Sequence, residues 1–210
     1  TVSRASLHNF SELEKKDIRE GDVVYVEKAG EIIPQVVGVR LEDRPAESEP
    51  FPRPTACPSC GSEVVEEEVF IRCPNPACPE QVRERLTHFA SRGAMDIDGM
   101  GPAIVDQLVE KLGVTSPDQI FSLEAPALAS LERMGEKSAE NLVRAIEAAK
   151  GRGLARVLVG LSIRHVGEAM AEALAAEFGS ADALLEFAGR YVQGDAEAVQ
   201  RVVPQKSGER

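Results

Sequence analysis

The sequence predicts a multidomain, mainly α-helical protein in which strands and metal ligands precede the helices. Alternating β-type residues occur near the N-terminus, the cysteines all fall within residues 57–78, and helical periodicity starts at Pro79. Because the strands come first and the helices follow, we expect separate modules and not one alternating α/β sheet.

Composition is ordinary for a globular protein, with 43% hydrophobic and 28% charged residues in a chain of 210. No apolar run approaches the ~20 residues that cross a bilayer, and the first ten residues, TVSRASLHNF, lack a signal-peptide core. These features favour a cytoplasmic protein, and a chain that begins without Met is expected to be a piece of a longer one. The net charge of -11 argues against a simple basic nucleic-acid binder.

The segment GDVVYVEKAGEIIPQVVGV, residues 21–39, predicts a β-hairpin. A turn at Ala29 and Gly30 separates two β-rich runs, and Pro34 marks the second run as an edge-type strand. Residues 40–56 are acidic and rich in proline, which is typical of a linker.

The segment CPSCGSEVVEEEVFIRCPNPACPE contains a C-x2-C pair and a C-x4-C pair. Two close pairs joined by a short hairpin bring four thiolates to one point, as tetrahedral zinc requires. A catalytic zinc keeps an open position, so four cysteines predict a structural metal. Two disulfides or a redox pair remain alternatives, although nothing else indicates secretion and no βαβ unit surrounds the pair. The predicted ligands are Cys57, Cys60, Cys73 and Cys78.

Three glycines each stand between an apolar turn and a helical run. Gly101, Gly135 and Gly167 follow one another at intervals of 34 and 32 residues. Each is followed by apolar residues at helical spacing, which predicts one buried face per helix. These residues are Ile104, Val105, Leu108, Val109 and Leu112 after the first glycine, Leu142, Val143 and Ile146 after the second, and Met170, Leu174 and Phe178 after the third.

A period near 33 residues also suits a helical solenoid, which would carry its signature along both helices of a repeat. The other interpretation is a set of helical hairpins that offer backbone amides to DNA phosphates. Glycine permits a positive φ and a close backbone approach, and the helix dipole favours an anion at the next helix start. Such a site needs no net positive protein.

Several neighbours of these glycines are further candidates for phosphate binding. Gly99 belongs to the first turn, and Lys137, Arg164 and His165 supply local charge at the other two. Arg133 and Arg164 are expected where the first glycine of a G-x-G turn would stand. The alternative is that the glycines only form turns and that the charged side chains are only solvated, without binding a phosphate.

Together, these motifs resemble the bacterial NAD-dependent DNA ligases. VSRASLHN and KAGEIIPQVVGV resemble the OB domain, and the cysteine segment resembles the zinc finger of that family. HFASRGAMDIDGMG, LERMGEKSAENL and LSIRHVGEAMAEALAAEFG resemble its helix-hairpin-helix domain. The resemblance implies a partial OB fold at residues 1–44, a linker at 45–56, a zinc finger at 57–78 and a helix-hairpin-helix domain at 79–210. A five-stranded barrel cannot close from these strands alone, so unpaired strand edges are expected.

The resemblance also implies a reaction. These ligases adenylate a lysine with NAD, transfer AMP to the 5′-phosphate of a nick, and join that phosphate to the 3′-hydroxyl, with magnesium. The lysine belongs to a K-x-D-G motif in an N-terminal nucleotidyltransferase domain, and this sequence contains no such motif. We therefore expect this chain to hold nicked DNA, to contribute no catalytic residue and to be inactive alone. NAD and magnesium would bind outside it, in an enzyme of the bacterial cytoplasm associated with the nucleoid.

Two further expectations come from the resemblance. Arg4 and His8 match an OB segment near the DNA backbone. The fourth hairpin of the family would fall at VQRVVPQKSGER, residues 199–210, where no G-x-G is present, so we expect it to be degraded, truncated or diverged. We expect the C-terminal BRCT domain of the family to lie outside this sequence. A non-enzymatic helix-hairpin-helix protein of DNA repair or recombination is the alternative function.

Overall fold

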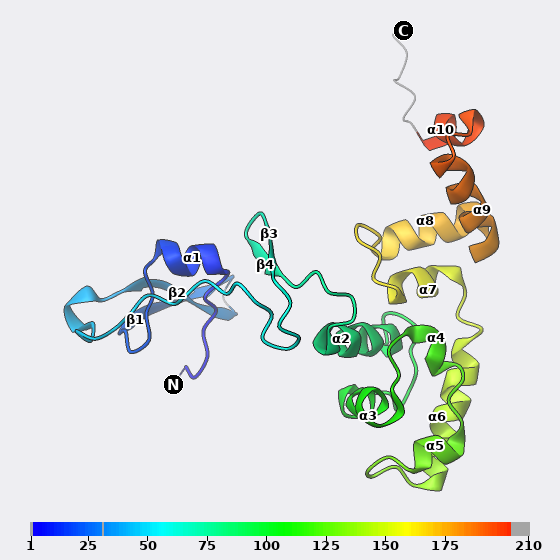
Figure 1. Cartoon of the computed structure of the whole chain (residues 1–210), viewed down its shortest axis with the longest axis horizontal. Coiled ribbons are helices and arrows are strands. Elements are labelled where there is room, and N and C mark those ends of the chain that lie inside the picture. Colours follow the sequence, from blue (N-terminus) through cyan, green and yellow to red (C-terminus); the bar gives the residue numbers. More distant parts are fainter. Residues whose placement is uncertain (1, 31, 203–210) are drawn as a thin grey trace. The chain divides into compact units, whose positions relative to one another are not determined.

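The computed structural model describes residues 2–30 and 32–202, and these form two compact units, the first ending at Cys78 and the second beginning at Pro79. Figure 1 shows strands in the first unit and a succession of helices in the second. The chain is therefore mainly α-helical and multidomain, as the sequence predicts. Within the described part, no helix is both long and apolar enough to cross a membrane.

The first unit begins with helix α1 (Phe10–Lys15) and the antiparallel pair β1 (Val24–Ala29) and β2 (Ile33–Val39). Asn9 caps α1, because its side chain accepts a hydrogen bond from the backbone N–H of Glu12. Leu13, Ile18 and Val36 form a small buried cluster between helix and hairpin.

The outer edge of β2 is partly paired, so the expected bare edge is wrong at this point. The N–H of Ser6 donates to the carbonyl of Pro34, and the N–H of Val36 donates to the carbonyl of Ser6, at 2.8 and 3.0 Å. Pro34 has no N–H to donate, but its carbonyl accepts a hydrogen bond from the segment around Ser6, which lies along this edge of β2.

The acidic segment after β2 is fastened to the hairpin module by ion pairs. It starts with a 3-10 turn, η1 (Leu41–Asp43), and the guanidinium of Arg44 contacts both Asp17 and Asp22. Hydrogen bonds from Arg19 and then Arg44 lower the pKa of Asp17 to about 2. Arg19 also donates to the carbonyl of Ser48, at 2.9 Å, so this part of the predicted linker is anchored.

The metal module contains the short antiparallel strands β3 (Val65–Glu67) and β4 (Phe70–Arg72). The second unit contains α2 (Pro79–Ala90), α3 (Pro102–Leu112), α4 (Pro117–Ile120), α5 (Ala125–Ala129), α6 (Glu136–Ala149), α7 (Leu154–Gly160), α8 (Glu168–Phe178), α9 (Ala181–Val192) and α10 (Ala196–Val202). Four pairs pack against each other as helical hairpins: α2 with α3, α5 with α6, α7 with α8, and α9 with α10.

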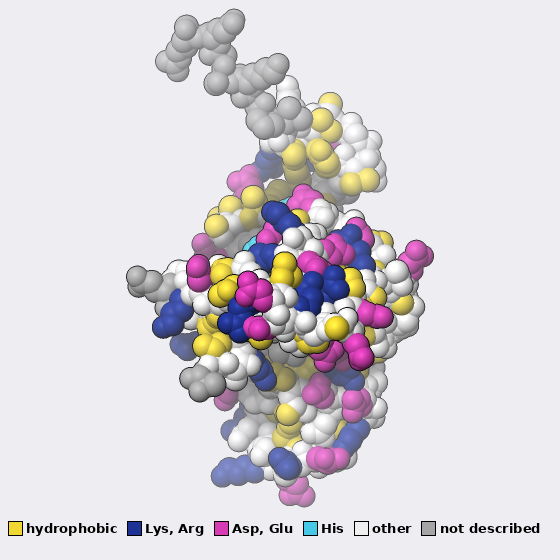
Figure 2. All heavy atoms as spheres, turned by 90° about the vertical axis from the view of Figure 1, so that its left-hand side faces the viewer, with side chains coloured by type: hydrophobic (Ala, Val, Ile, Leu, Met, Phe, Trp, Pro, Cys, Tyr) yellow, Lys and Arg dark blue, Asp and Glu magenta, His cyan; other side chains and the backbone are white. Residues whose placement is uncertain are grey.

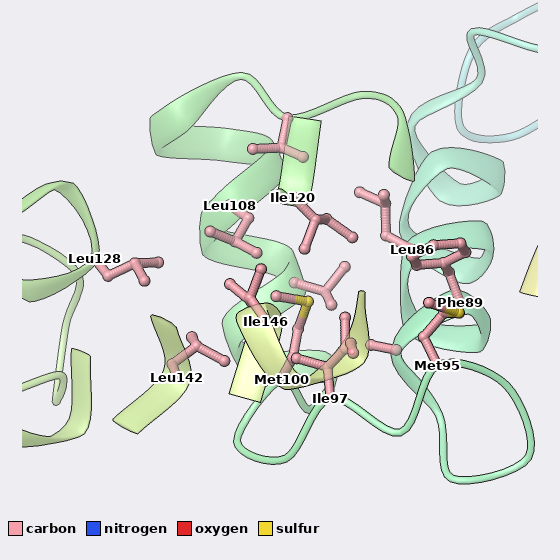
Figure 3. Close-up of a cluster of buried hydrophobic side chains, with 14 of the residues drawn as sticks. Leu86, Phe89, Met95, Ile97, Met100, Leu108, Ile120, Leu128, Leu142 and Ile146 are labelled. Atoms are coloured by element: carbon pink, nitrogen blue, oxygen red, sulfur yellow. The ribbon is translucent and has the colours of Figure 1, made fainter. Parts of the chain in front are cut away.

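One apolar core joins the first two of these pairs, α2 with α3 and α5 with α6 (Figure 3). Leu108 of α3 and Leu142 of α6 are buried in it, as their helical spacing predicts. The predicted face of α8 is partly wrong, because Met170 is 51% exposed whereas Ala171 is fully buried. Because α8 is rich in alanine, its buried face can be formed by small side chains. Ala171 lies on that face, and the larger neighbouring side chain of Met170 does not.

Candidate metal centre and nucleic-acid interface

The four predicted cysteine ligands meet at one point. Their Sγ atoms all lie within 4.8 Å of one another, with 3.9 Å from Cys57 to Cys78 and 3.6 Å from Cys60 to Cys73. A tetrahedral ion with Zn–S bonds of ~2.3 Å requires Sγ–Sγ separations of ~3.8 Å, whereas a disulfide requires ~2.05 Å. The cysteines are free thiols that fit a closed, structural zinc site, and the disulfide alternative is wrong.

Two tight turns place these thiols. In the first, the N–H of Gly61 donates to the carbonyl of Cys57 at 2.9 Å, and Gly61 adopts a φ of 73°. In the second, the side-chain oxygen of Asn75 accepts a hydrogen bond from the backbone N–H of Ala77, and the backbone carbonyl of Asn75 accepts one from the backbone N–H of Cys78. Each turn closes on one cysteine pair, which is why proline, glycine and asparagine accompany the pairs in the sequence.

The thiols differ in acidity. Hydrogen bonds with the Ser62 side chain and backbone lower the pKa of Cys60 to about 6. A backbone hydrogen bond from Asn75 lowers the pKa of Cys73, but burial and the neighbouring thiols of Cys60 and Cys57 outweigh it and raise that pKa to about 12. Four thiolates packed this closely repel one another, so a bound cation is needed to hold all of them charged.

In the second unit, three turns share one backbone geometry: turn 1 (residues 97–101), turn 2 (131–135) and turn 3 (163–167). The carbonyl of the first residue accepts the N–H of the fourth, from Met100 to Ile97, Met134 to Leu131 and Val166 to Ile163, at 3.2, 3.2 and 2.9 Å. Met100 and Met134 are buried, and Val166 is half-buried. Each turn is therefore anchored by its apolar fourth residue, and its third and fifth residues are exposed.

The third residue of each turn has a positive φ: 85° at Gly99, 60° at Arg133 and 68° at His165. The fifth residue is the glycine that starts the next helix, and its φ is ordinary: -80° at Gly101, -80° at Gly135 and -86° at Gly167.

The structure corrects two expectations about these turns. Gly101 does not need a positive φ, because the left-handed residue stands two positions earlier. In turn 3 that position belongs to His165 and not to Arg164, which is the second residue of the turn. Aligning IDGMG, LERMG and IRHVG by their last glycine would have placed Arg133 and His165 opposite Gly99 from the sequence alone.

The helix starts after the three turns are open to an anion. No described side chain caps α3, α6 or α8 at its N-terminal glycine, and a Cβ added at Gly101, Gly135 or Gly167 would meet nothing within 4 Å. First-turn amides of these helices therefore lack side-chain acceptors, which is the arrangement that binds phosphates.

The start of α10 differs from the other three. There the side chain of Asp195 accepts the N–H of Ala198 at 2.9 Å, and Asp195 also pairs with Arg190. A carboxylate already occupies this helix start, so it offers no comparable anion site. The fourth hairpin predicted at residues 199–210 lies mostly outside the described residues.

Charge around the turns is local. Arg133, Lys137, Arg164 and His165 are all exposed at turns 2 and 3, whereas the first turn of α3 carries no acidic residue and has Pro102 at its start. Figure 2 shows acidic and basic side chains interspersed on the visible face, with no basic stripe.

Arg4 and His8 lie in the first unit, separate from the turns. Both are exposed, and His8 adopts a φ of 70° with its N–H donated to the side chain of Ser6 at 3.1 Å. His8 lines an apolar cavity of about 400 Å³ together with Phe10 and Phe70.

Family models match the chain along most of its length. The NAD-dependent DNA ligase OB-fold domain matches residues 1–48, and the NAD-dependent DNA ligase C4 zinc finger domain matches 56–79. A SAM-like helix-hairpin-helix tandem matches 92–148, and a helix-hairpin-helix motif matches 156–191. The last two matches contain the three turns.

Curated relatives agree with these matches. The chain is 50% identical to a DNA ligase of Methylacidiphilum infernorum and 52% identical to one of Limosilactobacillus fermentum, each over 88% of its length. It is 46% identical to a DNA ligase of Geobacter metallireducens over 98% of its length. It spans only 27%, 28% and 30% of these three relatives. The chain belongs to the NAD-dependent DNA ligase family and corresponds to its OB, C4 zinc-finger and helix-hairpin-helix regions.

Proposed function

We propose that this chain is the DNA-holding part of an NAD-dependent ligase that seals nicks in duplex DNA during replication and repair. The observation that carries the proposal is the threefold recurrence of one turn with an uncapped helix start, in a chain of this family. Backbone amides at such turns bind phosphates without reading bases. The DNA-contacting residues of the proposal are Arg4, His8, Gly99, Gly101, Gly135, Lys137, Arg164, His165 and Gly167.

The chemistry of ligation is assigned to a nucleotidyltransferase domain of the same protein, with NAD and magnesium bound there. No K-x-D-G motif occurs in this sequence, so none of its residues is given a catalytic role. The zinc site serves the fold, since its four thiolates leave no open coordination position. We place the enzyme in the bacterial cytoplasm, at the nucleoid.

The alternative, a non-enzymatic repair accessory protein, explains the turns equally well. It does not explain matches to OB and zinc-finger models specific to this ligase family. A protein-binding solenoid explains neither the family matches nor the uncapped helix starts.

Fluorescence anisotropy with labelled duplexes tests the proposal. The protein should bind two nicked duplexes of unrelated sequence with equal affinity, should prefer them mildly over an intact duplex, and should lose affinity as salt rises. Absence of binding at low salt would contradict the proposal, and so would binding that follows the base sequence.

The isolated chain should form no adenylate when incubated with labelled NAD, because it lacks the motif that activates a lysine. It should also leave nicked DNA unsealed. Gel autoradiography checks both outcomes, and a labelled AMP adduct on Lys15, Lys28 or any other lysine would overturn this assignment. Adding the nucleotidyltransferase part as a separate chain should restore only weak sealing, because the linkage that raises effective concentration is missing.

A further inference from the structure

Turn 2 carries an arginine at a backbone position that favours glycine. Arg133 has a φ of 60°, and the equivalent residue of turn 1 is Gly99, with a φ of 85°. Glycine adopts this conformation without steric cost, whereas an arginine adopts it with strain. The fold alone would therefore be served better by glycine at residue 133.

The preceding helical hairpin holds turn 2 in this conformation. The N–H of Glu132 donates to the side-chain oxygen of Gln107 at 2.6 Å, and the side-chain amide of Gln107 donates back to the carbonyl of Glu132 at 3.3 Å. This two-way pairing fixes the peptide directly before Arg133. Strained residues persist where surrounding contacts determine their conformation, and Gln107 on α3 supplies such contacts.

The same helix neutralises the acidic side chain that directly precedes Arg133 in the sequence. Lys111 of α3 lies 2.7 Å from the carboxylate of Glu132, and its hydrogen bond and charge lower the pKa of that carboxyl. Arg133 itself is exposed, and no ion pair joins it to another described residue. Lys137, the second residue of α6, is likewise exposed and forms no described ion pair.

A free guanidinium thus stands beside an uncapped helix start. The first turn of α6 has an acidic residue, Glu136, which weakens the attraction of the helix dipole for an anion. α3 has no acidic residue in its first turn, and its turn has Gly99 in place of Arg133. Arg133 therefore precedes α6, whose backbone amides and dipole alone would bind an anion less well than those of α3.

We propose that Arg133 is a DNA-binding residue whose guanidinium contacts a backbone phosphate at turn 2, and that Gln107 positions it. This inference rests on the proposed function and adds a residue to it. A guanidinium can bind two phosphate oxygens at once, so turn 2 binds DNA by an ionic contact and turn 1 by backbone amides. The salt dependence of binding should accordingly arise in part from turn 2.

Arg133→Gly removes the guanidinium and should keep the turn, because glycine adopts a φ of 60° without strain. The variant also gives turn 2 the same residue that turn 1 has at the equivalent position, Gly99. Measured by anisotropy on a nicked duplex across a salt series, the variant should bind about 5- to 10-fold more weakly at low salt. The slope of log K against log salt should fall by about 0.9, the value for one lost phosphate contact. Arg133→Lys should keep the slope and recover part of the affinity.

Lys150→Ala is the control for a lost charge, since it removes one exposed positive charge, paired with Glu147, at the C-terminal end of α6. It should change affinity and slope far less than Arg133→Gly. Equal binding by Arg133→Gly and the parent would overturn the inference, and so would equal losses in Arg133→Gly and Lys150→Ala. If the parent itself fails to bind, the proposed function fails and the role of Arg133 fails with it, whereas a parent that binds beside an unaffected Arg133→Gly variant overturns the role of Arg133 alone. Thermal unfolding should show Arg133→Gly at least as stable as the parent.

Discussion

Replacing Cys78 with serine is expected to abolish zinc binding and to unfold residues 57–78. Cys78 is 1% exposed, and in this segment only it and Cys57 are buried among the described residues. Strands of three residues each cannot bury an apolar core, so the metal takes the place of one. Zinc binding supplies ~10–16 kcal/mol in small zinc-finger peptides, and losing one ligand removes most of that stabilisation.

Elemental analysis should find one zinc per chain in the parent protein and none in Cys78→Ser. In amide NMR spectra, signals of residues 57–78 should collapse to unfolded positions. Far-UV circular dichroism should change little, because the helices lie in a separate compact unit. Val65→Ser is the control, because it alters a 40% exposed side chain of β3 and no metal ligand. This variant should retain one zinc per chain and the amide NMR spectrum of the parent. A parent without zinc, or a Cys78→Ser variant that keeps both zinc and dispersed signals, would show that the cysteines do not form the metal site.

The metal ligands could be predicted from the sequence because their signal is local. Cys57 and Cys60 share one turn, Cys73 and Cys78 share another, and the chemistry of four thiolates allows few other arrangements. The buried faces of α3 and α6 were similarly predictable, since Leu108 and Leu142 follow the helical period.

Other features depended on contacts that the sequence does not display. The pairing of Ser6 with β2 joins segments almost thirty residues apart, and nothing in the residue types marks it. The exposure of Met170 depends on which face of α8 meets α7, and alanine-rich helices leave that choice open. The pairing of Gln107 with the backbone of Glu132 joins two helical hairpins, and nothing in the residue types marks it.

Gly101→Asp is expected to leave the fold intact and to weaken binding of nicked DNA by at least ~10-fold, or ~1.4 kcal/mol. At φ -80° and ψ 174° the backbone suits any residue, and a Cβ there meets nothing within 4 Å. Asp is a better helix N-cap than Gly, so α3 should gain a few tenths of a kcal/mol. Its carboxylate would accept the free amides of the first turn and would repel a phosphate at the same place.

Two controls separate this effect from its alternatives. Gly101→Ser adds an N-cap without charge, so it should retain more affinity than Gly101→Asp. Gln200→Glu adds one negative charge at an exposed position of α10, away from the three turns, and should weaken binding only slightly at moderate salt. Anisotropy gives the dissociation constants, and thermal unfolding verifies that each variant is folded. If folded Gly101→Asp binds nicked duplex as tightly as the parent, turn 1 does not contact a phosphate, and Gly101 serves only to connect the turn to α3.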